Sequence, residues 1–79
     1  MKPIEIEKKV IEIIEYYSLY ERTELTDKMY QFDWVDLENT VIELEDKFNI
    51  YISDNDRDNF ETVGDIVKFV QKKYNEKEV

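Results

Sequence analysis

Apolar side chains recur at helical spacing in three stretches of the chain. In the first stretch, positions 6, 10, 13, 14 and 17 carry Ile, Val, Ile, Ile and Tyr, which places them on one face of a helix. Pro3 suits the first turn of this helix, because that turn leaves the backbone amides of its residues unbonded. The pattern predicts an amphipathic helix beginning near residue 3. Residues 21–32 show no period and are expected to form a surface loop.

A second helix is predicted to begin at Asp33, whose carboxylate can accept hydrogen bonds from the free amides of the first turn. Its apolar residues recur every three or four positions. The expected buried face consists of Leu37, Val41, Leu44 and Phe48. Asn49 is a suitable end, because Asn tolerates the left-handed backbone conformation. Residues 50–52 form a short extended piece, too short to make a sheet by itself.

The third stretch follows a polar segment, residues 53–60, which has room for one short helical turn. Thr62 and Asp65 are spaced as a capping pair at the start of a last helix. The apolar positions of this helix are Val63, Ile66, Val67, Val70 and Tyr74. We therefore expect an all-α fold, a small bundle of three main helices and one short helix. At 79 residues it forms a single domain, residues 1–79.

Composition narrows the possible functions. The chain has no Cys and no His, which excludes thiolate metal sites, zinc-water hydrolysis and His-based nucleophilic triads, so we do not expect an enzyme. Twenty acidic against eleven basic residues give a net charge of −9, which argues against nucleic acid and anionic membranes and favours a basic partner. No apolar run approaches the roughly 20 residues of a membrane span, and from the first five residues we expect no signal peptide. A cytoplasmic protein, monomeric by itself, is expected.

One acidic cluster imitates a calcium loop. Asp54, Asp56 and Asp58 alternate, and Asp65 falls at the twelfth position, as in a helix–loop–helix calcium site. The turn glycine is missing, however, and Glu61 occupies a place that is normally apolar. We therefore expect no dedicated metal site here, and interpret the cluster either as a solvated acidic loop or as a loop that binds cations weakly and without specificity.

The second helix carries the most informative surface. Six acidic side chains against one lysine lie between residues 33 and 47, a net charge of −5. Such a run is usually just a solvated face. However, Val35 and Ile42 lie seven residues apart, off the buried stripe and among acidic neighbours, as in an interface that docks a partner. Trp34 also lies off the stripe, and burial beneath the preceding loop and exposure are both open for it.

These residues resemble a known family. Residues 33–48 read Asp-Trp-Val-Asp-Leu-Glu-Asn-Thr-Val-Ile-Glu-Leu-Glu-Asp-Lys-Phe, and Ile-Tyr-Ile follows at 50–52. This run is similar to the second helix of acyl carrier proteins and the segment that leaves it. Residues 62–70, Thr-Val-Gly-Asp-Ile-Val-Lys-Phe-Val, are similar to their last helix. The resemblance implies a four-helix bundle whose acidic second helix docks on basic patches of partner enzymes.

The sequence departs from the family at the attachment position. Acyl carrier proteins have Asp-Ser-Leu at the start of the second helix, and the serine hydroxyl holds a 4′-phosphopantetheine arm. The corresponding triplet here is Asp33-Trp34-Val35, and an indole cannot form that phosphodiester. The preceding loop is also shorter than usual and lacks the Leu-Gly of the family. No 4′-phosphopantetheine cofactor is therefore expected.

We interpret the chain as a non-catalytic, acyl-carrier-protein-like interaction module. It docks through its second helix on a basic protein surface, such as a biosynthetic enzyme that binds carrier proteins. The resemblance implies that Val35 and Ile42 are apolar docking positions and that four nearby acidic residues are acidic ones. Together with their neighbours, the candidate partner-binding residues are Asp33, Trp34, Val35, Asp36, Glu38, Asn39, Ile42, Glu45 and Asp46.

Two other interpretations stay open. The chain can be a carrier of fatty-acid, polyketide or related biosynthesis that holds a ligand non-covalently between its helices or uses an unrecognised attachment site. Alternatively, Trp34 is a substitution introduced into an ordinary carrier to block modification, although the shortened loop argues against a single change.

Overall fold

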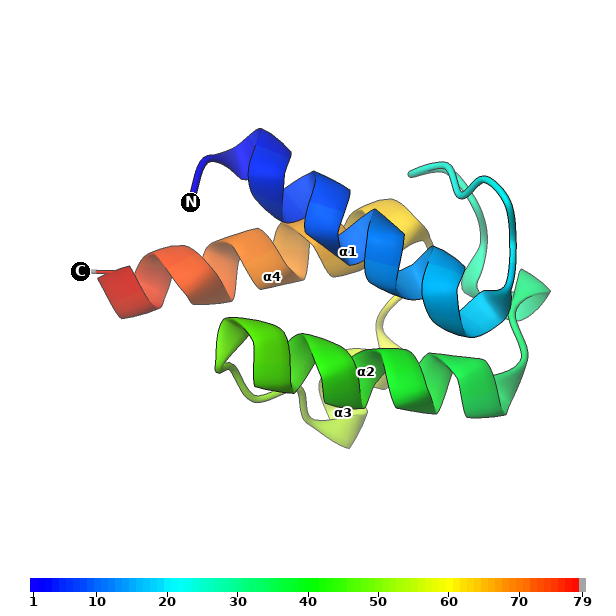
Figure 1. Cartoon of the computed structure of the whole chain (residues 1–79). Helices are drawn as coiled ribbons and strands as arrows, with labels where there is room; N and C mark the ends of the chain where they lie inside the picture. Colours follow the sequence, from blue (N-terminus) through cyan, green and yellow to red (C-terminus); the bar gives the residue numbers. More distant parts are fainter. Residues whose placement is uncertain (79) are drawn as a thin grey trace.

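Three amphipathic helices pack their apolar faces together, as the hydrophobic pattern predicts. The structure is a computed structural model that describes residues 1–78. Its elements are α1 (Pro3–Ser18), the 3-10 turn η1 (Met29–Gln31), α2 (Trp34–Phe48), α3 (Asp54–Asp58) and α4 (Val63–Glu78). Helices α2 and α4 both run opposite to α1, and the start of α1 lies at the same end of the bundle as the end of α4 (Figure 1). The predicted all-α bundle of three main helices and one short helix is confirmed.

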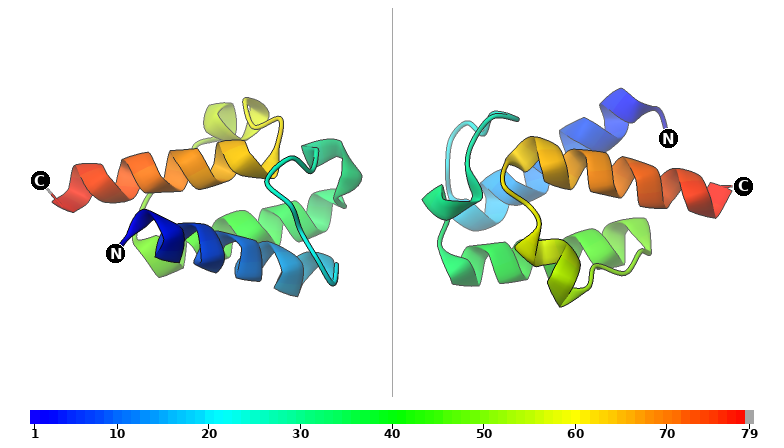
Figure 2. Two further views of the ribbon diagram at one scale, coloured as in Figure 1. Left: turned by 90° about the horizontal axis from the view of Figure 1, so that it is seen from above. Right: turned by 180° about the vertical axis from the view of Figure 1, so that it is seen from behind.

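The core lies where α1, α2 and α4 meet. Figure 2 shows the three long helices from above and from behind, with the short α3 outside them, in the segment that leads from α2 to α4. The buried apolar residues are Ile6, Val10, Ile13, Ile14, Phe32, Val41, Leu44, Phe48, Ile52, Val63, Ile66, Val67 and Val70. None of the helices formed by residues 1–78 is both long and apolar enough to span a bilayer.

The ends of α2 are fixed by side chains. The carboxylate of Asp33 accepts a hydrogen bond from the amide of Val35 at 2.9 Å, which confirms the predicted cap. At the other end, Asn49 adopts the predicted left-handed conformation, with φ 52°. The ammonium group of Lys77, in the last turn of α4, donates to the carbonyl oxygens of Phe48 and Asn49 at 3.3 and 2.8 Å. These bonds satisfy carbonyl groups that the helix end leaves unpaired.

The segment between α1 and α2 adds contacts to the expected surface loop. It pairs with the start of α4: the amide of Val63 donates to the carbonyl of Asp27 at 2.9 Å, and that of Gly64 donates to Leu25 at 2.7 Å. Phe32 is buried and lies against the ring of Tyr20, with 5.0 Å between ring centroids. The segment is a mostly exposed loop, as expected, but it also supplies a buried aromatic residue and backbone bonds to α4, which its aperiodic sequence did not indicate.

The structure also tests two smaller predictions, the buried stripe of α2 and the capping pair at the start of α4. Leu37, expected in the buried stripe, is only half-buried, whereas Thr40 is buried and donates its hydroxyl to the carbonyl of Asp36 at 2.8 Å. The capping pair at α4 is confirmed, since Asp65 and Thr62 exchange hydrogen bonds between backbone amide and side chain at 3.1 and 3.3 Å.

Candidate docking surface on helix α2

Trp34 is the first residue of α2, and its indole points to solvent. The residue exposes 64% of its surface, so of the two alternatives left open by the sequence, exposure is the one observed. The cap at Asp33 explains part of this, because it fixes the first turn of α2 and therefore the direction in which the indole leaves the helix. A large aromatic ring that is mostly exposed at the start of a helix is available to another molecule.

The apolar pair that the sequence places off the buried stripe is also exposed. Val35 and Ile42 expose 59% and 62% of their surfaces. Glu38, Asn39 and Asp46 are exposed beside them. We call these five residues the outward face of α2. The predicted combination of apolar residues and an acidic rim is therefore present on one side of the helix.

Two of the candidate acidic residues are less available than the sequence suggested. Glu45 is half-buried, and its Oε2 accepts a hydrogen bond from the amide of Ile52 at 2.8 Å, which ties the segment after α2 back onto the helix. Asp36 is half-buried as well. Among the candidate acidic residues, Asp33, Glu38 and Asp46 are the exposed ones.

Sequence reasoning missed Arg57 of α3. Its guanidinium carbon lies 5.6 Å from the centroid of the Trp34 ring, in a cation–π arrangement. The two terminal nitrogens of the group lie 3.4 Å from Asp54 Oδ1 and 3.9 Å from Glu38 Oε1. Only 20% of the Arg57 side chain is exposed. The one signal in the sequence was a lone Arg in an acidic segment, and nothing in the spacing links it to Trp34.

The acidic cluster that imitates a calcium loop is helical. Residues 54–58 form α3, where Ser53 accepts a hydrogen bond from the amide of Asp56 at 3.1 Å and Asp56 accepts one from the amide of Ser53. Asp65 belongs to the cap of α4, and the amides of Glu61 and Thr62 that donate to it hold its pKa below the ordinary value. In the part of the chain that the structure describes, no three His, Cys, Asp or Glu residues are arranged to hold a metal ion.

An apolar groove of about 320 Å³ opens beside Trp34. It runs between η1, α2 and the segment around α3, and reaches the buried residues Phe32, Val41 and Ile66. Trp34 and Arg57 line it, as does Tyr30, which exposes 86% of its surface. The sequence did not predict this groove, because its lining comes from four separate segments.

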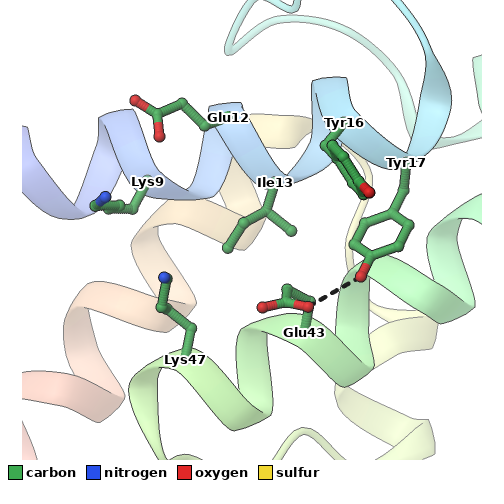
Figure 3. A pocket seen from close by; sticks show the side chains of 7 residues that line it. All are labelled: Lys9, Glu12, Ile13, Tyr16, Tyr17, Glu43 and Lys47. Carbon is green, nitrogen blue, oxygen red and sulfur yellow. Dashed lines mark hydrogen bonds between the residues drawn. The ribbon is translucent and has the colours of Figure 1, made fainter.

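A second hollow, about 440 Å³, lies between α1 and α2 (Figure 3). Ile13 and Tyr17 point from α1 toward α2, while Glu43 and Lys47 point back from α2. The hydroxyl of Tyr17 donates to Glu43 Oε1 at 2.9 Å, and this bond to a carboxylate is the main reason that the pKa of Tyr17 lies above its ordinary value. Glu43 therefore joins the two helices and is not part of the outward face.

The residues at the start of α2 do not fit a covalently attached 4′-phosphopantetheine arm. Trp34 offers no hydroxyl at the position that the resemblance assigns to the attachment serine. The nearest hydroxyl in α2, that of Thr40, is buried and bonded to the carbonyl of Asp36. The hydroxyl of Ser53 is used in the cap of α3.

Comparisons with known proteins identify the family. No family model matches the chain. It is 42% identical over 43 residues to the acyl carrier protein of Chlamydia muridarum and 40% identical over 43 residues to that of Chlamydia trachomatis. Each match covers 54% of this chain and 56% of the relative, so the chain spans little more than half the length of these two proteins.

A longer match covers more of both chains. The acyl carrier protein of Exiguobacterium sibiricum is 38% identical over 56 residues, which are 65% of this chain and 71% of that protein. This match covers most of a protein of similar size. It agrees with the helical bundle and with the capped, acidic α2 described above. The chain belongs to the acyl carrier protein family.

Proposed function

We propose that this chain is a family member without a prosthetic group, which works as a non-catalytic docking module. In this proposal, α2 binds a basic surface on a partner enzyme of the kind that recognises acyl carrier proteins. The chain would act there as a decoy, a regulator or a subunit. The observation that carries the proposal is that Val35 and Ile42 remain exposed in an acidic rim on the same helix that begins with Trp34, at the position assigned to the attachment serine.

Charge supports the choice of partner. The net charge of −9 and the six acidic groups between residues 33 and 47 favour a cationic protein surface and disfavour nucleic acid, anionic membranes and a second copy of this chain. Asp33, Glu38 and Asp46 are the exposed acidic groups of this helix on the docking side, so they would supply most of the attraction. Such steering acts on the association rate and weakens as salt is added.

The test of docking is competition. An acyl-transferring enzyme is assayed with its own acyl carrier protein, and this chain is added as the competitor. Wild type is expected to inhibit, Ile42→Ala to inhibit less because an exposed apolar contact is lost, and Asp46→Lys to inhibit less at low salt. Glu21→Lys is the matched control, since Glu21 is exposed in the loop after α1 and the variant changes the net charge equally. If Ile42→Ala and Asp46→Lys both inhibit as well as Glu21→Lys does, the docking surface has been misassigned.

The absence of the arm is tested by mass. Wild type and a Trp34→Ser variant are each incubated with coenzyme A and a permissive phosphopantetheinyl transferase. We expect wild type to keep its mass and Trp34→Ser to gain the arm, since the cap at Asp33 and the start of α2 do not depend on the indole. A mass gain by wild type would overturn the proposal, because it would reveal a working attachment site elsewhere.

The apolar groove supports a second candidate function, a carrier that holds its ligand non-covalently. Its volume of about 320 Å³ falls at the small end of the range for ligand sites, and its deepest residues belong to the core. Native mass spectrometry of the protein as purified separates the two functions. A retained ligand adds mass, whereas a docking module by itself does not.

A further inference from the structure

The start of α2 presents an aromatic surface that the fold does not use. Trp34 exposes 64% of its surface and Tyr30 exposes 86%, and both line the mouth of the apolar groove. Val35, the next residue in α2, exposes 59%. Tryptophan is the side chain most often found as an energetic anchor of protein interfaces, because it buries a large area with few rotatable bonds.

The indole is held in place before any partner arrives. Arg57 lies over its ring at 5.6 Å, and Arg57 is itself restrained by Asp54 and Glu38. With the backbone of the first turn fixed by the cap at Asp33, the ring is supported from both the helix and α3. A side chain that is already ordered loses less conformational entropy on binding, which favours an anchor role.

The charges around the indole indicate what covers it. Asp33 and Glu38 of α2 and Asp54 and Asp58 of α3 are exposed, and Arg57, the basic group among them, is largely covered. A second copy of this chain would bring the same acidic groups against them. A cationic protein surface with an apolar slot satisfies both the ring and its rim.

We propose, building on the docking function above, that Trp34 is the anchor of the interface. Its indole enters an apolar slot in the basic surface of a carrier-binding enzyme, and Arg57 is a positioning residue that sets the angle of the ring. The residue that removes the attachment chemistry would thereby supply the central contact of the complex.

The experiment uses the acyl-transferring enzyme of the competition assay as its probe. Trp34 is the single tryptophan of the chain, so labelling with 5-fluorotryptophan gives one fluorine NMR signal. That signal is expected to shift or broaden when the enzyme is added at low salt. Concentration-dependent broadening of the labelled chain in the absence of enzyme would instead mean that a second copy covers the ring, which would overturn the proposal.

Substitutions then measure the size of the contact. Trp34→Ala is expected to weaken inhibition by about 30-fold, the scale of a central interface residue. Tyr51→Ala is the matched control, because Tyr51 exposes 74% of its surface but lies beyond the end of α2. It is expected to stay within about twofold of wild type, as peripheral contacts do. Circular dichroism before each titration verifies that the variants keep the helical fold.

The pattern of losses separates this proposal from the docking function. If Asp46→Lys and Ile42→Ala weaken inhibition but Trp34→Ala does not, the docking function stands and the anchor is refuted. If none of the three has an effect, the docking function itself fails. Equal losses for Trp34→Ala and Tyr51→Ala would also refute the anchor, because exposed aromatic area alone would then explain both.

The role of Arg57 has its own readout. Arg57→Gln is expected to move the fluorine signal of the free protein, since the cation leaves the ring, and to weaken inhibition by about threefold, the low end of a cation–π contribution. Arg57→Lys keeps the charge and is expected to restore part of both effects. An unchanged fluorine signal in Arg57→Gln would refute the positioning role.

Discussion

The two faces of α2 are both partly apolar, but one is buried in the bundle and the other is exposed to water. On the inward face, Val41, Leu44 and Phe48 are buried against α1 and α4. On the outward face, Val35 and Ile42 expose more than half of their surfaces to water. The fold gains stability mainly from the first set, whereas the second set is available to a contact outside the molecule. The comparison predicts that substitutions on the two faces separate stability from binding.

The largest effect on stability is expected from Leu44→Ala on the inward face. Leu44 is fully buried, and removing three carbons there leaves a cavity among α1, α2 and α4. We expect the free energy of unfolding to fall by about 3 kcal/mol, which urea denaturation followed by circular dichroism measures. A loss below about 1 kcal/mol would mean that the core collapses around the gap.

Asp33 belongs to both sides of the comparison, because it caps α2 and also carries one of the exposed charges. Asp33→Ala removes the acceptor for the amide of Val35 and should cost about 1 kcal/mol of stability. Asp33→Ser keeps a capping oxygen without the charge. It should retain most of the stability while inhibiting the carrier-binding enzyme less than wild type. Equal stability of the two variants would show that the cap contributes little.

Asp65 is a carboxylate that contributes to the stability of the fold, and the pH dependence of unfolding tests this contribution. Hydrogen bonds from the amides of Glu61 and Thr62 lower the pKa of Asp65 in the folded protein below its ordinary value of 3.8. The charged form is therefore stabilised by folding, and this contribution is lost as the pH falls through 3.8 toward the folded pKa. Asp65→Asn should lose less stability than wild type between neutral and acid pH. Parallel pH profiles would contradict this.

The smallest effect on stability is expected from Ile42→Ala on the outward face. The side chain exposes 62% of its surface, so its removal should change the free energy of unfolding by less than about 0.5 kcal/mol. The same variant should inhibit the carrier-binding enzyme less well. A destabilisation similar to that of Leu44→Ala would erase the distinction between the two faces.

The inward face of α2 was predictable because helical spacing is a local property. Val41, Leu44 and Phe48 recur at three and four residues, and Asp33 and Asn49 mark the ends of the helix by their own chemistry. The exposure of Val35 and Ile42 followed from the same spacing. Trp34 was undecided, because a ring at the first helical position can turn either toward the preceding loop or toward solvent.

Other features were not predictable for a physical reason. The contact between Arg57 and Trp34 joins residues far apart in the sequence and depends on where α3 lies, which no periodicity encodes. The burial of Phe32 and the pairing of Leu25 and Asp27 with α4 involve an aperiodic segment, whose place is set by backbone bonds to a helix that comes later in the chain. The apolar groove was not predictable for the same reason, because its walls come from segments that are far apart in the sequence.

The pairing of the long loop with the first turn of α4 determines how the outward face of α2 comes into being. A peptide comprising residues 33–48 would be near the length below which isolated helices are only marginally formed in water. In the intact chain, the residues that enter α2 are tied to α4 through the carbonyls of Leu25 and Asp27, and the end of α2 is tied to α4 through Lys77. We therefore expect the outward face of α2 to become fully ordered only after the last helix has been synthesised.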